Sequence, residues 1–178
     1  EIAHPFLDGN GRLGRLLITL MLINDGVLHS CLFYPSFQFK KNRSEYYRQL
    51  TSVRERGTYE EWIEFFCNSL LESAEDSVGS LKNLVDLHNR STATITENLG
   101  RTAANGQRLL GILEEHPIVD TAFIAAQLDI GRSTASSLVK SFEELGILRP
   151  LDESRQRYRQ YGYEEYLSIL REDAEPIR

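Results

Sequence analysis

The sequence has few cysteines, no long apolar run and no excess of basic residues. Its two cysteines, Cys31 and Cys67, are too few for a framework of several disulfides or a four-thiolate metal site. We interpret them as reduced core residues, with a single disulfide as the open alternative. No run approaches the ~18 apolar residues of a membrane-spanning helix, and no signal peptide is recognised. We therefore expect a cytoplasmic protein that does not contact a membrane.

Low-complexity tracts and internal repeats are also lacking, and the 178 residues are 41% hydrophobic and 26% charged. This composition is typical of a soluble globular protein with one ordinary domain or two small ones. The net charge of −6 argues against nonspecific coating of nucleic acid, but it is compatible with a local basic patch. Because the chain starts with Glu1, directly inside a motif, we expect it to be part of a longer protein.

Apolar spacing predicts helices, and no strand, in the first half of the chain. Residues 11–25 have the spacing of a helix with one buried face, and a loop is expected over residues 29–39. Further helices are predicted over 43–56, from Thr58 to about Ser77, and over 80–99. The residues expected to face the core are Leu13, Leu16, Leu17, Leu20, Met21, Trp62, Ile63, Phe66, Cys67, Leu70 and Leu71.

From about Gln107 the pattern predicts a winged helix-turn-helix. A short helix closed by Pro117 precedes a second helix over 121–129, a tight turn, and a third helix over 133–146. Residues 147–163 then alternate like a two-stranded hairpin, which completes the element order of that fold. We predict a mainly α chain, with this domain over 105–178 and a helical linker over 79–104. The third helix should face inward with Ala135, Leu138, Val139, Phe142 and Leu145.

The stretch richest in chemistry is HPFLDGNGRLGRLL, residues 4–17. Its glycines let backbone N–H groups approach a ligand at a helix end that carries roughly half a positive charge. Arg12 and Arg15, three residues apart, lie on one helix face, where guanidinium groups can clamp phosphate oxygens. Asp8 suits a hard cation such as Mg²⁺, and His4 can accept a proton near neutral pH. Together they predict transfer of a phosphate-bearing group to a hydroxyl.

The alternative is purely structural: HPF as a turn, DGNG as a helix start and the arginines as a solvated face. The fragment GNG alone would favour that alternative. The combined pattern is too specific for coincidence.

The same stretch resembles the Fic family motif, H-x-F-x-[D/E]-G-N-G-R-x-x-R. The matching residues are His4, Phe6, Asp8, Gly9, Asn10, Gly11, Arg12 and Arg15. The resemblance implies an all-α core that binds a nucleoside triphosphate with Mg²⁺; most Fic proteins transfer AMP from ATP to a Ser, Thr or Tyr hydroxyl of a protein and release pyrophosphate. Through NRSEYYRQLTSVRERGTYEEWIEFF it extends over residues 1–78, the later half of a Fic core.

The resemblance also implies a role for each motif residue. His4 would deprotonate the incoming hydroxyl, Asp8 would hold Mg²⁺, and Phe6 would pack the motif into the core. The nucleotide phosphates would be bound by Gly9, Asn10, Gly11, Arg12 and Arg15. Tyr47 could reach the adenine side of the pocket, with Arg54 as a weaker candidate; the alternative is that the paired tyrosines only pack.

Two features of the Fic family are not found. The hairpin flap that positions the target normally precedes the motif. The autoinhibitory helix carries [S/T]-x-x-x-E-[G/N], and the nearest match, ATITEN, departs from it at Ala93. We expect the flap, and the inhibitory helix if one exists, in a preceding part of the protein. This chain by itself should be a weak or inactive enzyme.

Residues 105–178 hold nine Lys and Arg against thirteen Asp and Glu, whereas DNA-binding domains are more often basic. Some polar positions could still contact DNA or a protein partner. They are Arg132, Ser133, Ser136, Ser137 and Lys140 on the third helix and Arg155, Arg157 and Arg159 in the wing. We favour dimerisation or docking of a target protein over DNA contact. His29, His88 and His116 lack the spacing of metal ligands.

The sequence thus predicts a bacterial protein adenylyltransferase that uses ATP, Mg²⁺ and a protein hydroxyl. One alternative is a nucleotide-sensing transcriptional regulator that binds DNA through the winged helix. Another is a Fic enzyme that transfers a different phosphate-bearing group. His4 and the two arginines favour catalysis, because a pure sensor needs no base.

Overall fold

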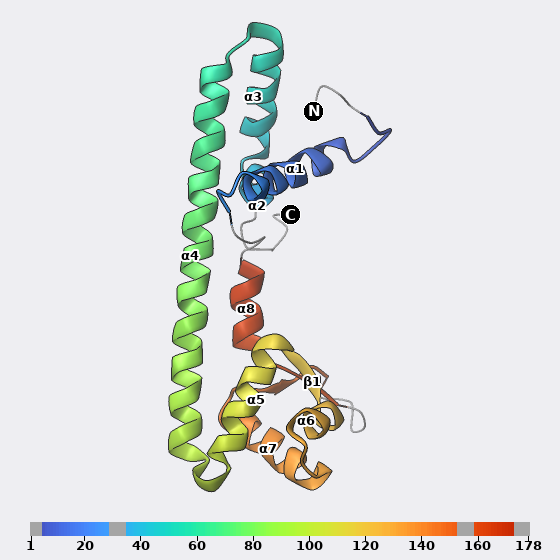
Figure 1. The fold of residues 1–178 in the computed structure, drawn as a ribbon, viewed down its shortest axis with the longest axis vertical. Coiled ribbons are helices and arrows are strands. Elements are labelled where there is room, and N and C mark those ends of the chain that lie inside the picture. Colours follow the sequence, from blue (N-terminus) through green and yellow to red (C-terminus); the bar gives the residue numbers. More distant parts are fainter. Residues whose placement is uncertain (1–4, 29–34, 153–158, 173–178) are drawn as a thin grey trace. The chain divides into compact units, whose positions relative to one another are not determined.

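The computed structural model describes residues 5–28, 35–152 and 159–172. These residues are mainly helical and include one three-stranded antiparallel sheet, which confirms the predicted mainly α fold class. The chain divides into two compact units, and the division falls at Gly79 and Ser80. Both residues lie within one long helix, α4 (Tyr59–Asn98), drawn in green in Figure 1.

The described part of the first unit consists of α1 (Asn10–Asn24), α2 (Pro35–Lys41), α3 (Arg43–Arg56) and the first half of α4. α3 has the predicted bounds and ends at Gly57, whose φ of 70° is a conformation that favours glycine. α2 begins inside the segment predicted as a loop and covers its residues 35–39, so the loop prediction was wrong there. Seven residues are too few for a clear helical period, and α2 is stabilised by tertiary packing instead.

An aromatic cluster forms the core of the first unit. Phe39 of α2 is 2% exposed, and its ring centroid lies 5.3 Å from that of Tyr46 and 5.8 Å from that of Phe66. Trp62 of α4 packs edge-on against Tyr46 at 5.7 Å. The cluster therefore fastens α2 and α3 to the first half of α4.

The face of α1 that the sequence predicts as buried is exposed. α1 contains no buried residue, although its helical period is as expected. The exposed apolar side chains are Leu13, Leu16, Leu17, Leu20 and Met21. Periodicity identifies an apolar face but not the element that covers it, so the core assignment was wrong within the described residues.

The helices predicted over 58–77 and 80–99 are one helix, α4, because the Gly79–Ser80 step continues in helical conformation. The apolar stripe predicted on its first half is only partly correct. Trp62, Phe66 and Leu70 are half-buried, whereas Ile63, Leu71 and Cys67 are exposed. Cys67 is therefore not a core residue, and Cys31 lies outside the described residues.

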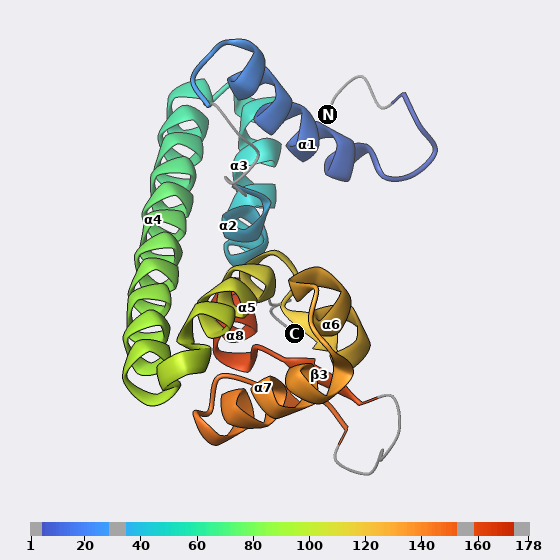
Figure 2. The ribbon, with the colours of Figure 1, turned by 60° about the horizontal axis from the view of Figure 1, so that its bottom comes forward.

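The second unit contains the rest of α4 and a compact set of short elements. They are the 3₁₀ helix η1 (Gly100–Thr102), α5 (Ala103–Glu115), β1 (Ile118–Asp120), α6 (Thr121–Leu128), α7 (Arg132–Glu144), β2 (Arg149–Pro150), β3 (Gln160–Gly162) and α8 (Glu164–Glu172). Figure 2 shows α5, α6, α7 and β3 gathered in this unit. β2 and β3 pair antiparallel as the predicted hairpin, with Pro150 opposite Tyr161.

Two elements of the second unit, β1 and α8, were not predicted from the sequence. β1 pairs antiparallel with β3, with Val119 opposite Tyr161, so the sheet order is β1-β3-β2. Three residues carry too little periodicity to reveal a strand. α8 begins directly after the stretch predicted as a hairpin, where no element was predicted. Asp120 caps α6 by accepting a hydrogen bond from the Phe123 N–H at 2.8 Å.

The second unit has a continuous apolar core. The inward residues predicted on α7 are confirmed: four are buried, and Leu145 packs against the same cluster half-buried. Residues predicted as a helical linker also belong to this core, through Leu84, Leu87, Ile95 and Leu99. The core cluster includes Leu109, Leu110, Leu113, Ile124, Leu128, Leu138, Phe142, Leu148 and Tyr163.

Polar contacts fasten α8 and α5 to α4 within the second unit. The hydroxyls of Ser91 and Tyr163 lie 2.8 Å apart in the interior. Arg90 donates to Glu165 at 2.9 Å at the surface. His88 Nδ1 lies 2.7 Å from a carboxylate oxygen of Glu114. Burial raises the pKa of Tyr163 to about 12, because a tyrosinate would lose most of its hydration there.

Candidate functional site

The described part of the opening motif is a short loop that runs into the first turn of α1. Asn10 holds this loop in place through both ends of its amide. Its Oδ1 accepts a hydrogen bond from the Phe6 N–H at 3.0 Å, and its Nδ2 donates to the Phe6 carbonyl at 2.6 Å. The loop is therefore tied to the helix that follows it.

Gly9 makes the turn from the loop into α1. Its φ of 82° and ψ of 3° are left-handed, a conformation that costs residues with a Cβ energy. Among the residues that the structure describes, no side chain caps this helix end, and the first N–H groups of an α-helix have no intrahelical acceptor. The start of α1 thus presents unpaired N–H groups together with the positive end of the helix dipole.

Asp8 and Arg12 lie on either side of this helix end. Asp8 Oδ1 accepts a hydrogen bond from the Gly9 N–H at 2.6 Å, and its Oδ2 lies 3.7 Å from an Arg12 guanidinium nitrogen. Both side chains are largely exposed, so both can exchange this contact for a ligand at low cost. Arg15 follows one turn later and is half-buried.

The structure brings most of the predicted motif residues to one place. Asp8, Gly9, Asn10, Gly11 and Arg12 meet at the start of α1, whereas His4 lies outside the described residues. Phe6 was expected to pack the motif into the core, and this expectation was wrong for the described residues. Its side chain is 58% exposed. The hydrogen bonds from Asn10 fix the backbone of Phe6 and not its ring.

The donors of this helix end suit a phosphate, and the one carboxylate suits a magnesium ion bound together with phosphates. Mg²⁺ is usually held by one or two carboxylates plus substrate oxygens rather than by an all-protein cage. The described residues contain no group of three or more His, Cys, Asp or Glu that could hold a metal by themselves.

Tyr47, the first adenine-side candidate, lies on the exposed side of α3. Its side chain is 51% exposed, and the Arg43 guanidinium carbon lies 5.6 Å from its ring centroid. It borders a shallow hollow of about 380 Å³ whose other walls include Arg48 and Thr51. Arg54 is exposed but does not line this hollow.

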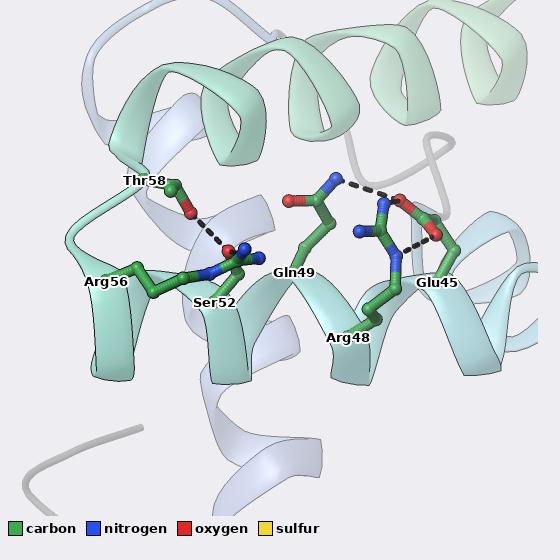
Figure 3. Close-up of polar contacts among 6 residues, drawn as sticks. All are labelled: Glu45, Arg48, Gln49, Ser52, Arg56 and Thr58. Carbon is green, nitrogen blue, oxygen red and sulfur yellow. Dashed lines mark hydrogen bonds and ion pairs between the residues drawn. The ribbon is translucent and has the colours of Figure 1, made fainter.

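A polar network on α3, shown in Figure 3, was not singled out from the sequence. Arg48 donates to both carboxylate oxygens of Glu45, at 2.8 and 2.5 Å, and Gln49 donates to Glu45 at 2.8 Å. The hydrogen bond from Arg48 lowers the pKa of Glu45 below its usual value. The i, i+3 spacing of Glu45 and Arg48 is the signal that could have indicated this pair.

At the end of α3, the Ser52 hydroxyl accepts a hydrogen bond from Arg56 at 2.7 Å and lies 2.5 Å from the Thr58 hydroxyl. These contacts fix the turn between α3 and α4. Arg48 and Arg56 both line the hollow beside Tyr47.

The described candidate contact residues of the second unit lie on α7 and directly before β3. Arg132, Ser136 and Lys140 are exposed along one side of α7, and Lys140 Nζ lies 3.7 Å from Glu144. Arg159 is half-buried, whereas Arg155 and Arg157 lie outside the described residues. His88 and His116 contact Glu114 and Phe123 respectively, and neither belongs to a cluster of potential metal ligands among the described residues.

Comparisons with known proteins give partial similarity to protein adenylyltransferases. A probable protein adenylyltransferase of Aquifex aeolicus is 36% identical over 55 residues, 31% of this chain. The protein adenylyltransferases fic-1 of Caenorhabditis elegans and Caenorhabditis briggsae are 31% identical over 85 and 81 residues, 48% and 46% of this chain. These similarities support a Fic-like relationship.

The similarity covers 15% of each of these relatives, so this chain matches only a small part of their length. No family model matches the chain. The names of the relatives support AMP transfer to proteins at the level of the family. In the described part of the chain, every helix is too short or too polar to cross a membrane.

Proposed function

We propose that this chain belongs to a Fic-type enzyme that transfers AMP from ATP to a Ser, Thr or Tyr hydroxyl of a protein. One observation carries the proposal: beside the loop held by Asn10, Asp8 lies against the Gly9 N–H and 3.7 Å from Arg12 at the start of α1. A triphosphate bound there would meet hydrogen-bond donors, a cationic side chain and the positive end of a helix dipole.

The reaction assigns one task to each group. The target hydroxyl oxygen forms a bond to the α-phosphorus, the bond from that phosphorus to the bridging oxygen breaks, and pyrophosphate leaves. His4 accepts the hydroxyl proton. The N–H groups of Gly9, Asn10 and Gly11 stabilise the charge that develops on the phosphate oxygens.

Arg12 and Arg15 bind the remaining phosphate oxygens. Ordering these two side chains costs conformational entropy, which bidentate hydrogen bonds to the phosphate offset. Mg²⁺, when bound, neutralises part of the triphosphate charge, and Asp8 would hold it. Tyr47 is proposed for the adenine side because its exposed ring offers a stacking surface. Arg54 stays the weaker candidate, since it does not border the hollow beside Tyr47.

The experiment that tests this function incubates the full-length protein with ATP labelled at the α-phosphate, with cell lysate as the source of targets. Compared with lysate alone, we expect the protein to add labelled bands with α-labelled ATP and to add none with γ-labelled ATP, since AMP retains only the α-phosphate. His4→Ala should abolish labelling while MgATP binding survives, because the base does not bind the triphosphate. Labelling that persists in His4→Ala contradicts the base assignment, and γ-label on protein indicates phosphoryl transfer instead.

We propose a winged helix-turn-helix for the second unit, acting as a docking module rather than as a DNA reader. The order α5-β1-α6-α7-β2-β3 and the sheet order β1-β3-β2 support this fold. The outward side of α7 offers Arg132 and Ser136, but the nearby positive charge of Lys140 is offset by Glu144. This balance favours a protein partner over phosphates.

DNA binding by a nucleotide-sensing regulator is the competing function. Gel-shift measurements at low salt distinguish the two. A shift that is lost steeply as salt rises, and that Arg132→Ala weakens, favours the regulator. Binding that is absent at low salt favours the docking module.

A further inference from the structure

Basic residues are concentrated in one short segment of the first unit. Residues 40–56, which comprise the end of α2 and all of α3, hold six of the chain's 20 Lys and Arg and only two acids, Glu45 and Glu55. The next residues of the same unit, 57–79, hold six Asp and Glu and no Lys or Arg. The first unit therefore has a local positive segment, although the whole chain has a net charge of −6.

Three of these cations are neighbours at the junction of α2 and α3. They are Lys40, Lys41 and Arg43, which we call the α2–α3 cluster, and all three are exposed. None of them forms an ion pair with another described residue. By contrast, Arg48 donates two hydrogen bonds to Glu45, which neutralises its charge. The α2–α3 cluster therefore keeps its positive charge available to an external ligand.

The helix ends account for two of these charges but not for the third. The last turn of an α-helix favours cations, so Lys40 and Lys41 stabilise the end of α2. Arg43 lies in the first turn of α3, where the positive end of the helix dipole disfavours a cation. Neighbouring like charges also repel one another when no counter-charge is near. An anionic ligand would offset both unfavourable effects.

The ring of Tyr47 orders Arg43 for such a ligand. The guanidinium carbon of Arg43 lies 5.6 Å from the ring centroid, which is a cation–π contact. The N–H groups of this guanidinium donate no hydrogen bond to another described residue. Because the contact with the ring uses the face of the guanidinium, its N–H edge stays free, and that edge matches a carboxylate in a bidentate way.

We propose that the α2–α3 cluster binds an acidic segment of the target protein during AMP transfer. This inference rests on the proposed function, in which Tyr47 lies at the adenine side, so that the neighbouring Arg43 adjoins the nucleotide. Carboxylates of the segment pair with the three cations, and charge complementarity of this kind selects partners and speeds their encounter. The acids of residues 57–79 and the negative net charge disfavour a long polyanion such as nucleic acid.

Binding of a labelled peptide of six glutamates to the full-length protein tests the site, by fluorescence anisotropy and without ATP. At about 0.1 M salt, charges more than about 10 Å away are largely screened, so the measurement reports on local cations. We expect this peptide to bind at least about 10-fold more tightly than a peptide of six glutamines. Lys40→Glu together with Lys41→Glu should weaken its binding by at least about 10-fold, because two attractions become repulsions.

The matched control changes the net charge equally at another place. Arg101→Glu together with Arg108→Glu reverses two exposed cations of the second unit and should change the affinity by less than about 2-fold. A gain of binding keeps the test independent of folding. The Lys40→Glu, Lys41→Glu variant should bind a peptide of six lysines more tightly than the control variant does. Equal affinities of the two variants for the glutamate peptide overturn the proposal.

Competition links the site to AMP transfer. With Mg²⁺ in excess, the glutamate peptide should lower the labelling of lysate proteins by α-labelled ATP, whereas the glutamine peptide should not. Lys40→Glu together with Lys41→Glu should also lower labelling but leave the affinity for MgATP unchanged, because Arg43, which lies over Tyr47, is kept.

The outcomes separate this inference from the proposed function. Peptide binding without any AMP transfer contradicts the proposed function and supports the acidic-ligand site. AMP transfer that neither the peptide nor the lysine variant changes overturns the docking of targets at the α2–α3 cluster. A single-stranded oligonucleotide that binds more tightly than the glutamate peptide, and loses this binding in the lysine variant, indicates a nucleic-acid ligand and overturns the proposal as well.

Discussion

Two glycines of α5 provide a test of the second unit in which one substitution should have opposite effects at two positions. Gly106 is buried, and a Cβ built on it would lie 2.8 Å from both Ile95 Cγ2 and Leu99 Cδ1. Gly111 lies in the same helix, is exposed, and has no atom within 4 Å of such a Cβ. Alanine at each position gains the same helix propensity, about 1 kcal/mol.

The steric term decides the sign at Gly106. The γ-methyl of Ile95 is attached directly to a branched Cβ whose rotamer is fixed in a helix, so it cannot turn away cheaply. Ile95 is also fully buried, so the backbone must shift instead. Overpacking of this kind costs about 1–3 kcal/mol, which offsets or exceeds the gain in propensity. We therefore expect Gly111→Ala to stabilise the second unit by about 0.5–1 kcal/mol and Gly106→Ala to destabilise it by up to about 2 kcal/mol.

Urea unfolding followed by circular dichroism at 222 nm measures the difference. The two variants should differ by about 1–3 kcal/mol, because the propensity gain cancels and the steric cost remains. Fluorescence of Trp62, the only tryptophan, reports on the first unit and serves as an internal control. Equal free energies of unfolding for Gly106→Ala and Gly111→Ala would refute the close approach of α5 to Ile95 and Leu99.

Three further predictions concern single contacts. Tyr163→Phe removes the hydrogen-bond partner of the buried Ser91 hydroxyl and should lower the free energy of unfolding by about 1–2 kcal/mol. In a Ser91→Ala background the same change should cost less. Equal costs in the two backgrounds contradict the hydrogen bond. Because the pKa of Tyr163 is raised from 10.0 to about 12 in the folded protein, the unfolded state loses the phenol proton at lower pH. The free energy of unfolding should therefore fall as the pH rises from 10.0 to about 12. Urea denaturation in this pH range should show a shallower fall for Tyr163→Phe. Asn10→Ala removes both hydrogen bonds to Phe6, so titration calorimetry should show an affinity for MgATP about 10-fold lower. The control Asn24→Ala, at the other end of α1, should leave this affinity unchanged. Equal affinities of the Asn10→Ala and Asn24→Ala variants contradict a loop that positions the phosphate donors.

Helical periods were predictable where they were long. The bounds of α3 and the inward face of α7 follow from apolar spacing over thirteen or fourteen residues. α2 and β1 were missed because seven and three residues carry too little periodicity, and each owes its conformation to neighbours distant in sequence. In α1, the apolar period correctly predicts a helix, but the apolar face is exposed among the described residues and not buried as predicted.

The candidate site divides in the same way. The identity of Asp8, Gly9, Asn10 and Arg12, and their spacing before a helix, could be read from the sequence. The task of Asn10 could not, because its amide bonds to Phe6 depend on how the loop folds back onto α1. The exposure of the Phe6 side chain could not be predicted either, since a sequence motif does not specify which residues pack against it in the fold.

What the sequence by itself determined about this protein is local: the helix that follows DGNG, the residue types that suit a phosphate and Mg²⁺, and the polar outer side of α7. What only the tertiary structure decided is which apolar faces find a partner. The stretch predicted as two helices is one helix, α4, which contributes Leu87 and Ile95 to the core of the second unit and leaves Leu71 and Val85 exposed. The physical reason is that periodicity and residue chemistry act over a few turns of chain, whereas burial depends on surfaces supplied by segments far away in the sequence.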